Sequence, residues 1–90
     1  MITVDCGISA YEEIEYAKSL GLKVIVTDHH ECPEKLPDTI AVIDAKRSDD
    51  TYPFSSLAGV GVTFKLVQAL ASKMNLPKDS YFKYLDIVCL

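Results

Sequence analysis

The sequence predicts an α/β fold in which a short parallel sheet, of about three strands, is flanked by helices in three layers. Three apolar runs of strand length, residues 2–4, 24–26 and 40–43, lack polar alternation, which is typical of parallel strands covered on both faces. The segment between the first two runs is long enough for a right-handed strand-helix-strand crossover. Parallel pairing is therefore favoured over a hairpin.

The first strand and helix have clear boundaries in the sequence. Residues 1–5 are expected to form the first strand. Ser9 followed by Glu12 is a capping-box pattern, so we expect an amphipathic helix to begin there. Gly21 is placed to cap the end of this helix in the left-handed conformation, and the second strand is expected over residues 23–27.

The later elements follow a loop at residues 31–38, which contains two prolines and four charges. A third strand is expected at residues 40–43, ending in Asp44. A wide apolar stripe at helical spacing then predicts a helix packed on the sheet. Its members are Val60, Phe64, Val67, Ala71 and Met74, widened by Leu66 and Leu70. Residues 78–90 predict a last helix. Three of its side chains are expected to face inward, namely Phe82, Leu85 and Cys89.

Composition and charge narrow the classes of function. Ninety residues allow at most one domain with a modest core, and 49% hydrophobic with 24% charged residues is typical of a soluble globular chain. No apolar run approaches the ~20 residues of a membrane span, and the first residues lack the basic segment and apolar core of a signal peptide, so we expect a cytoplasmic protein without a membrane partner. The net charge of −4 argues against unaided binding to nucleic acid, but metal ions bound by acidic groups could reverse that sign locally.

The cysteines and the chain ends carry two further expectations. Cys6, Cys32 and Cys89 are odd in number and lack CxxC spacing, which predicts reduced thiols rather than a disulfide framework or a zinc ribbon. Met1 opens directly into a strand, and residues 85–90 are largely apolar with no polar stop behind them. The sequence is therefore expected to be a piece of a longer chain, cut at both ends.

Residues capable of chemistry gather where two predicted strands end. Asp5 follows the first strand, and Asp28, His29 and His30 follow the second. Because parallel strands bring their carboxyl ends to one edge of a sheet, we expect these groups to lie together. A carboxylate with an imidazole suits a divalent transition metal such as Mn²⁺. Adjacent histidines point in different directions, so one is expected to ligate the metal and the other to face the substrate.

Less specific interpretations stay open. The two histidines can be ordinary loop residues, and both aspartates can serve in turns or helix caps. A zinc site that recruits Cys6 and Cys32 is disfavoured, because structural zinc sites bring their ligands in close pairs. Residues 59–61, Gly-Val-Gly, are better explained as a tight helix start than as a phosphate site. Lys46 and Arg47 are expected to be solvated. Aromatic side chains in the same loop, Tyr52 and Phe54, are expected to pack on the core.

Several motifs together resemble the DHH phosphoesterase superfamily. Val4-Asp5-Cys6-Gly7 is followed by Thr27-Asp28-His29-His30-Glu31, and Tyr52-Pro53-Phe54 precedes the segment 58–66, Ala-Gly-Val-Gly-Val-Thr-Phe-Lys-Leu. The resemblance covers essentially the whole sequence. Its Ala-Gly-Val-Gly-Val segment favours the branch of single-stranded-DNA-specific exonucleases over the pyrophosphatase and small-nucleotide phosphodiesterase branches.

The resemblance implies a partial DHH domain over residues 1–90. It also implies a two-metal 5′→3′ exonuclease that acts on single-stranded DNA in repair and recombination, with Mn²⁺ or Mg²⁺ as cofactor. By the family's pattern, Asp5 matches the carboxylate that bridges the metals, and His29 matches a ligand to one of them. His30 matches the histidine near the scissile phosphate, and Asp28 matches the acid that orients its neighbours.

The family's pattern also has an upstream Asp-x-Asp strand and a further Asp beyond the segment matching residues 84–90, and neither is present in this sequence. The 90 residues alone are therefore expected to bind metal weakly, to leave DNA intact and to self-associate through a naked sheet edge. Two alternatives remain. One is another DHH-type phosphodiesterase or pyrophosphatase, and the other is a non-catalytic α/β binding module with a vestigial metal site.

Overall fold

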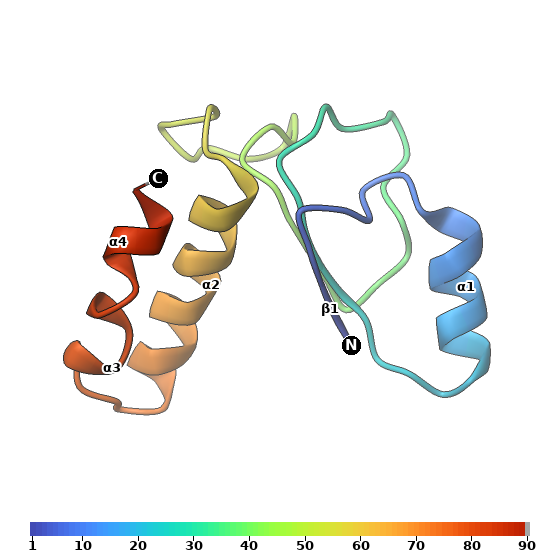
Figure 1. Ribbon diagram of the computed structural model, residues 1–90. Helices are drawn as coiled ribbons and strands as arrows, with labels where there is room; N and C mark the ends of the chain where they lie inside the picture. The colour runs from blue at the N-terminus through green and yellow to red at the C-terminus, as the bar shows by residue number, and fades with distance from the viewer. Residues whose placement is uncertain (90) are drawn as a thin grey trace.

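The computed structural model describes residues 1–89, which fold around a three-stranded parallel sheet (Figure 1). The strands are β1 (Ile2–Val4), β2 (Ile25–Thr27) and β3 (Ala41–Ile43), in the order β1-β2-β3. Their last residues are in register, because Val4 pairs with Thr27 and Thr27 with Ile43. The aspartates that follow the three strands therefore emerge at one edge of the sheet. The predicted α/β class and the parallel pairing are confirmed.

Helix α1 (Tyr11–Ser19) covers one face of the sheet and builds the larger core cluster. Its buried side chains, Ile14 and Ala17, pack with Val24 and Val26. The helix ends at Ser19 with Leu20 as its C-cap, and Gly21 follows in the predicted left-handed conformation, with a φ of 79°.

The predicted capping box at the start of α1 is wrong. The helix begins two residues after Ser9, and its N-cap is Ala10, without a side-chain hydrogen bond. A tight turn causes the delay, since the Ala10 N–H donates to the Gly7 carbonyl (3.1 Å). Ile8, inside that turn, donates its N–H to the Asp28 carboxylate (2.9 Å). The segment is therefore fixed by the end of β2 before the helix can start.

Three helices, α2 (Gly59–Lys73), α3 (Asp79–Phe82) and α4 (Leu85–Val88), gather on the other side of the strands (Figure 1). The predicted stripe on α2 does not pack broadly on the sheet. Its buried members, Phe64 and Ala71, contact Tyr81 of α3 instead. The first turns of α2 approach the strands, as the 3.4 Å contact between the hydroxyls of Thr63 and Thr27 shows.

The single last helix predicted for residues 78–90 is also wrong, because it is divided into α3 and α4. Tight three-residue turns surround the break: Tyr84 donates its N–H to the Tyr81 carbonyl, and Ile87 to the Tyr84 carbonyl. These turns rotate the buried face, because i to i+3 bonding winds the backbone more tightly than an α-helix does. Tyr81 is buried where Phe82 was expected. Of the other residues predicted to face inward, Leu85 packs on the core and Cys89 is exposed.

Other expectations have mixed outcomes. All three cysteines are free, as predicted. Phe54 is 57% exposed, so its expected packing on the core is wrong. Arg47 is engaged rather than solvated, because it pairs with Asp49 and donates to the Val42 carbonyl (2.6 Å). In the part of the chain that the structure describes, no helix is long and apolar enough to cross a membrane. Leu90, at the end of the predicted last helix, lies outside the described residues.

Candidate metal centre

Asp5 leaves β1 in an unusual backbone conformation. Its φ of 64° is left-handed, which costs energy for a residue other than glycine and is often found at functional sites. The conformation is held by neighbouring bonds: the Asp5 N–H donates to the Thr27 carbonyl (3.0 Å), and the Thr3 hydroxyl donates to the Cys6 carbonyl (2.7 Å). The turn after β1 is therefore fixed to both neighbouring strands.

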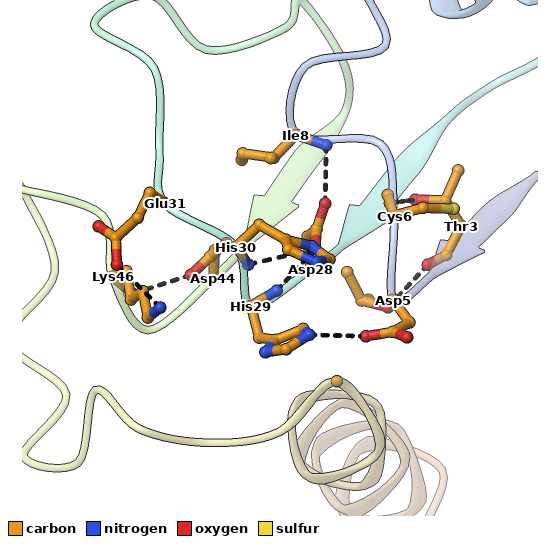
Figure 2. Close-up of polar contacts among 12 residues, drawn as sticks. Thr3, Asp5, Cys6, Ile8, Asp28, His29, His30, Glu31, Asp44 and Lys46 are labelled. Atoms are coloured by element: carbon orange, nitrogen blue, oxygen red, sulfur yellow. Dashed lines mark hydrogen bonds and ion pairs between the residues drawn. The ribbon is translucent and has the colours of Figure 1, made fainter.

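His29 meets Asp5 across the ends of β2 and β1. Its ring Nε2 lies 2.9 Å from Oδ1 of Asp5, and Figure 2 shows the two side chains directed at one another. Their side chains are partly open to solvent, at 32% and 61% exposure, so that an ion or a substrate can reach them. The two groups that the sequence placed at a common sheet edge are in direct contact. Their role as metal ligands stays a prediction.

Asp28, the residue before His29, is almost completely buried, with 1% exposure. Its Oδ2 accepts the N–H of Ile8 (2.9 Å), and its Oδ1 accepts the N–H groups of His29 (2.8 Å) and His30 (3.3 Å). Burial alone would raise the pKa of this carboxyl, but the hydrogen bonds from Ile8 and the histidines outweigh it and hold the pKa below its usual value. Asp28 is thus an anchor whose two carboxylate oxygens both already accept hydrogen bonds.

His30 is oriented by that anchor. Its ring Nδ1 lies 2.6 Å from Oδ1 of Asp28, so the Nδ1-protonated tautomer donates there and leaves Nε2 as the free nitrogen. The His30 side chain is 60% exposed, and its ring centroid lies 4.4 Å from that of His29 at an angle of 46°. The adjacent imidazoles therefore have different neighbours, as expected: His29 contacts Asp5 and His30 contacts Asp28 (Figure 2).

Asp44, after β3, was not identified as a site residue. It too is 1% exposed, and its Oδ1 accepts the Lys46 N–H (2.8 Å), but its Oδ2 has no hydrogen-bond partner. Burial raises the pKa of the Asp44 carboxyl, and the nearby Asp28 charge adds to the shift. Burial and the Asp44 charge also raise the pKa of the Cys32 thiol, which makes this cysteine a poor metal ligand. The position of Asp44 directly after the third apolar run is the sequence signal that could have identified it.

Asp5 and His29 fit a divalent ion as neighbouring ligands. Adjacent ligands of an octahedral ion at about 2.1 Å lie about 3 Å from one another, close to the observed 2.9 Å between Oδ1 and Nε2. One carboxylate oxygen and one imidazole nitrogen suit a divalent transition metal such as Mn²⁺. Within residues 1–89, however, no group of three or more His, Cys, Asp or Glu side chains is assembled that could hold a metal. The zinc site with Cys6 and Cys32 is accordingly not formed there.

Comparison with known proteins gives a consistent result. The family model described as "DHH family, N-terminal domain" matches residues 1–90. The single-stranded-DNA-specific exonuclease RecJ of Bacillus subtilis is 54% identical over 74 residues, covering 82% of this chain and 9% of the relative. RecJ of Escherichia coli is 40% identical over 99 residues, covering 100% of this chain and 17% of the relative.

A solved structure of RecJ from Thermus thermophilus in complex with Mn²⁺ superposes with a TM-score of 0.68 at 37% identity. The superposition covers 84% of this chain and 11% of that one. The chain thus spans less than a fifth of the length of these relatives. Because the family model matches residues 1–90, the chain belongs to the DHH family, of which it carries N-terminal-domain sequence.

Proposed function

We propose that this chain contributes part of the metal centre of a RecJ-type 5′→3′ exonuclease, which hydrolyses phosphodiester bonds of single-stranded DNA in repair and recombination. The observation that carries the proposal is the 2.9 Å contact between the Asp5 carboxylate and the His29 ring at the ends of two neighbouring parallel strands. The relatives named as single-stranded-DNA-specific exonucleases support the substrate, and the Mn²⁺ complex of one of them supports the cofactor.

In this proposal Asp5 and His29 hold Mn²⁺ or Mg²⁺. When bound, the metal supplies an activated water and neutralises charge on the attacked phosphate. His30 presents its free Nε2 toward the phosphate region, since its Nδ1 is held by Asp28. Asp28 positions both histidines through their backbone N–H groups and the His30 ring. The protein mainly positions the reacting groups, and in many enzymes such positioning accounts for a large part of the lowering of the activation barrier.

The 90 residues alone are proposed to bind metal weakly and to leave DNA intact, because only two of the predicted ligands are assembled within residues 1–89. A nuclease assay on single-stranded DNA with Mn²⁺ tests this. We expect no turnover. Turnover that disappears in His29→Ala would contradict the proposed inactivity while supporting the assigned site, and turnover that persists in that variant would count against the site itself.

The missing third ligand also favours a second candidate function, a non-catalytic α/β module with a vestigial site. The two candidates differ in their response to Mn²⁺. The exonuclease proposal predicts that Mn²⁺ broadens the NMR signals of His29 in the wild type and not in Asp5→Asn. A vestigial site predicts equal, unspecific broadening in both proteins.

We further propose that the isolated chain self-associates and that the activity belongs to the cytoplasm, where bacterial DNA is processed. The support for self-association is edge strand β1, where Ile2 and Val4 are each 50% exposed. Light scattering at increasing concentration tests it, with a rising mean mass as the expected result. A constant monomer mass over a hundredfold concentration range, on the order of micromolar to near-millimolar, would argue against it.

A further inference from the structure

We propose that Gly59 is a positioning residue for the Asp5 carboxylate, and that glycine is needed there for space rather than for backbone freedom. The inference deepens the proposed function and rests on it where metal binding is concerned. It assigns a role to the start of α2, which the sequence alone explained only as a tight helix start.

A side chain at Gly59 would overlap the side chain of Asp5. A Cβ built there lies 2.1 Å from Oδ1, 2.7 Å from Cγ and 3.0 Å from Cβ of Asp5. All three atoms belong to one side chain, and the first two distances are far below van der Waals contact. The Asp5 carboxylate therefore rests directly on the backbone of Gly59, with the same Oδ1 atom that meets His29.

Backbone conformation does not explain the glycine. Among the described residues, the glycines with positive φ are Gly7 and Gly21, so Gly59 adopts a conformation open to any residue. Alanine is the better helix former, and Gly59 is the first residue of a 15-residue helix. Local propensity thus favours alanine at this position, and the contact with Asp5 opposes it.

The start of α2 also lacks a cap of its own. Its N-cap, Ala58, makes no side-chain hydrogen bond, and no acidic residue lies in the first turn. The Asp5 carboxylate is the negative group packed against this positive helix end, and such placement is favourable. Asp5 is therefore held from three directions: by its left-handed backbone, by His29 and by the first residue of α2.

A methyl group at Gly59 has a predictable effect. Asp5 cannot shift its backbone easily, because its N–H is bonded to Thr27. Its side chain is 61% exposed, so the carboxylate can rotate toward solvent and abandon His29 at little cost in stability. Gly59→Ala is thus expected to fold and to lose the paired geometry that binds the ion.

The first test measures the affinity for Mn²⁺ from the broadening of the His29 NMR signals in the 90-residue chain. We expect Gly59→Ala to weaken binding about 10–100-fold, the usual range for residues that orient ligands. Gly61→Ala is the matched control, because its Cβ meets only the flexible Leu57 side chain, at 3.1 Å. Wild-type affinity in Gly59→Ala, or equal losses in both variants, would overturn the inference.

The second test needs no metal and measures thermal stability in an Asp5→Gly background. Glycine suits the left-handed conformation of residue 5 and removes the side chain that the methyl group meets. Gly59→Ala is expected to raise the melting temperature in this background and to lower it or leave it unchanged in the wild type. The same shift in both backgrounds would overturn the inference, as would a double variant that does not fold. Absence of Mn²⁺ binding in the wild type would instead contradict the proposed function, and the stability test would still decide the role of Gly59.

Discussion

The ends of β2 and β3 place two aspartates in matching positions with opposite consequences. Asp28 and Asp44 each follow the last residue of a strand, and each is 1% exposed. Asp28 accepts hydrogen bonds on both oxygens, whereas Oδ2 of Asp44 has no partner. The pKa of Asp28 is lowered and that of Asp44 is raised, although burial acts upward on both. The supply of N–H donors, rather than burial, decides the direction in which each pKa shifts.

The difference arises from the segments that follow each strand. After Asp28, two histidines turn back and return their backbone N–H groups to its carboxylate, and Ile8 adds a third from the preceding crossover. After Asp44, only the Lys46 N–H returns. The end of β2 thus holds a well hydrogen-bonded carboxylate that anchors the candidate site. The end of β3 holds a buried carboxylate with one unpartnered oxygen, which is unfavourable for stability.

The largest expected effect is that of removing the anchor. Asp28→Ala leaves the Ile8 N–H buried without a partner and releases both histidines, so we expect a loss of about 3 kcal/mol or more in the free energy of unfolding. Urea denaturation measures this. Asp28→Asn is the control that keeps one acceptor oxygen and should lose less. A loss below about 1 kcal/mol for alanine would show that the hydrogen bonds of Asp28 are unimportant.

Asp44→Asn is expected to increase the free energy of unfolding rather than lower it. The change removes a buried carboxylate whose Oδ2 is unpartnered and keeps an oxygen for the Lys46 N–H. We expect the free energy of unfolding at pH 7 to rise by about 1 kcal/mol, because a neutral amide costs less to bury than an unpartnered carboxylate near the Asp28 charge. A destabilisation as large as that of Asp28→Asn would remove the contrast between the two strand ends.

The pH dependence of stability separates the two acids further. Because the folded-state pKa of Asp44 is raised above 3.8, its contribution favours folding at low pH and is lost as pH rises through that pKa. The pKa of Asp28 is lowered, so its contribution is complete above 3.8 and is lost as pH falls through the lowered value. The urea midpoint should therefore depend less steeply on pH above pH 3.8 in Asp44→Asn than in the wild type. In Asp28→Asn it should depend less steeply on pH below pH 3.8. Identical profiles in the two variants would contradict these assignments.

The smallest effect is expected at the surface beside the β3 end. Glu31 pairs with Lys46 at 2.9 Å, but its side chain is 87% exposed (Figure 2). We expect Glu31→Ala to change the free energy of unfolding by less than about 0.5 kcal/mol, because solvent and salt screen exposed ion pairs. A change above about 1 kcal/mol, measured by the same urea titration, would mean that this pair compensates for the poorly supported Asp44.

The sequence sufficed for features that depend on strand direction. Uninterrupted apolar runs and a crossover of adequate length predicted parallel strands, and parallel strands necessarily bring Asp5 and His29 to one edge. Gly21 was recognisable as a helix cap because few residues adopt its left-handed conformation. These inferences need only local chemistry and the geometry of a sheet.

Features set by long-range partners could not be predicted. The start of α1 moved because Ile8 is bonded to Asp28, 20 residues away. The stripe of α2 packs on Tyr81, which is buried in the divided last helix in place of the predicted Phe82. The contact of Gly59 with Asp5 joins residues far apart in the chain, and no periodicity reveals it. Tertiary partners override local preference in each case.

A crystal of this chain soaked in Mn²⁺ tests the central claim most directly, through the anomalous scattering of the metal. The account predicts an anomalous peak within about 2.3 Å of both the Asp5 carboxylate and the His29 Nε2, typical of a directly bound divalent ion, with the Asp28 carboxylate left in its hydrogen bonds. A peak bound elsewhere, or no peak beside this pair at saturating Mn²⁺, would contradict it.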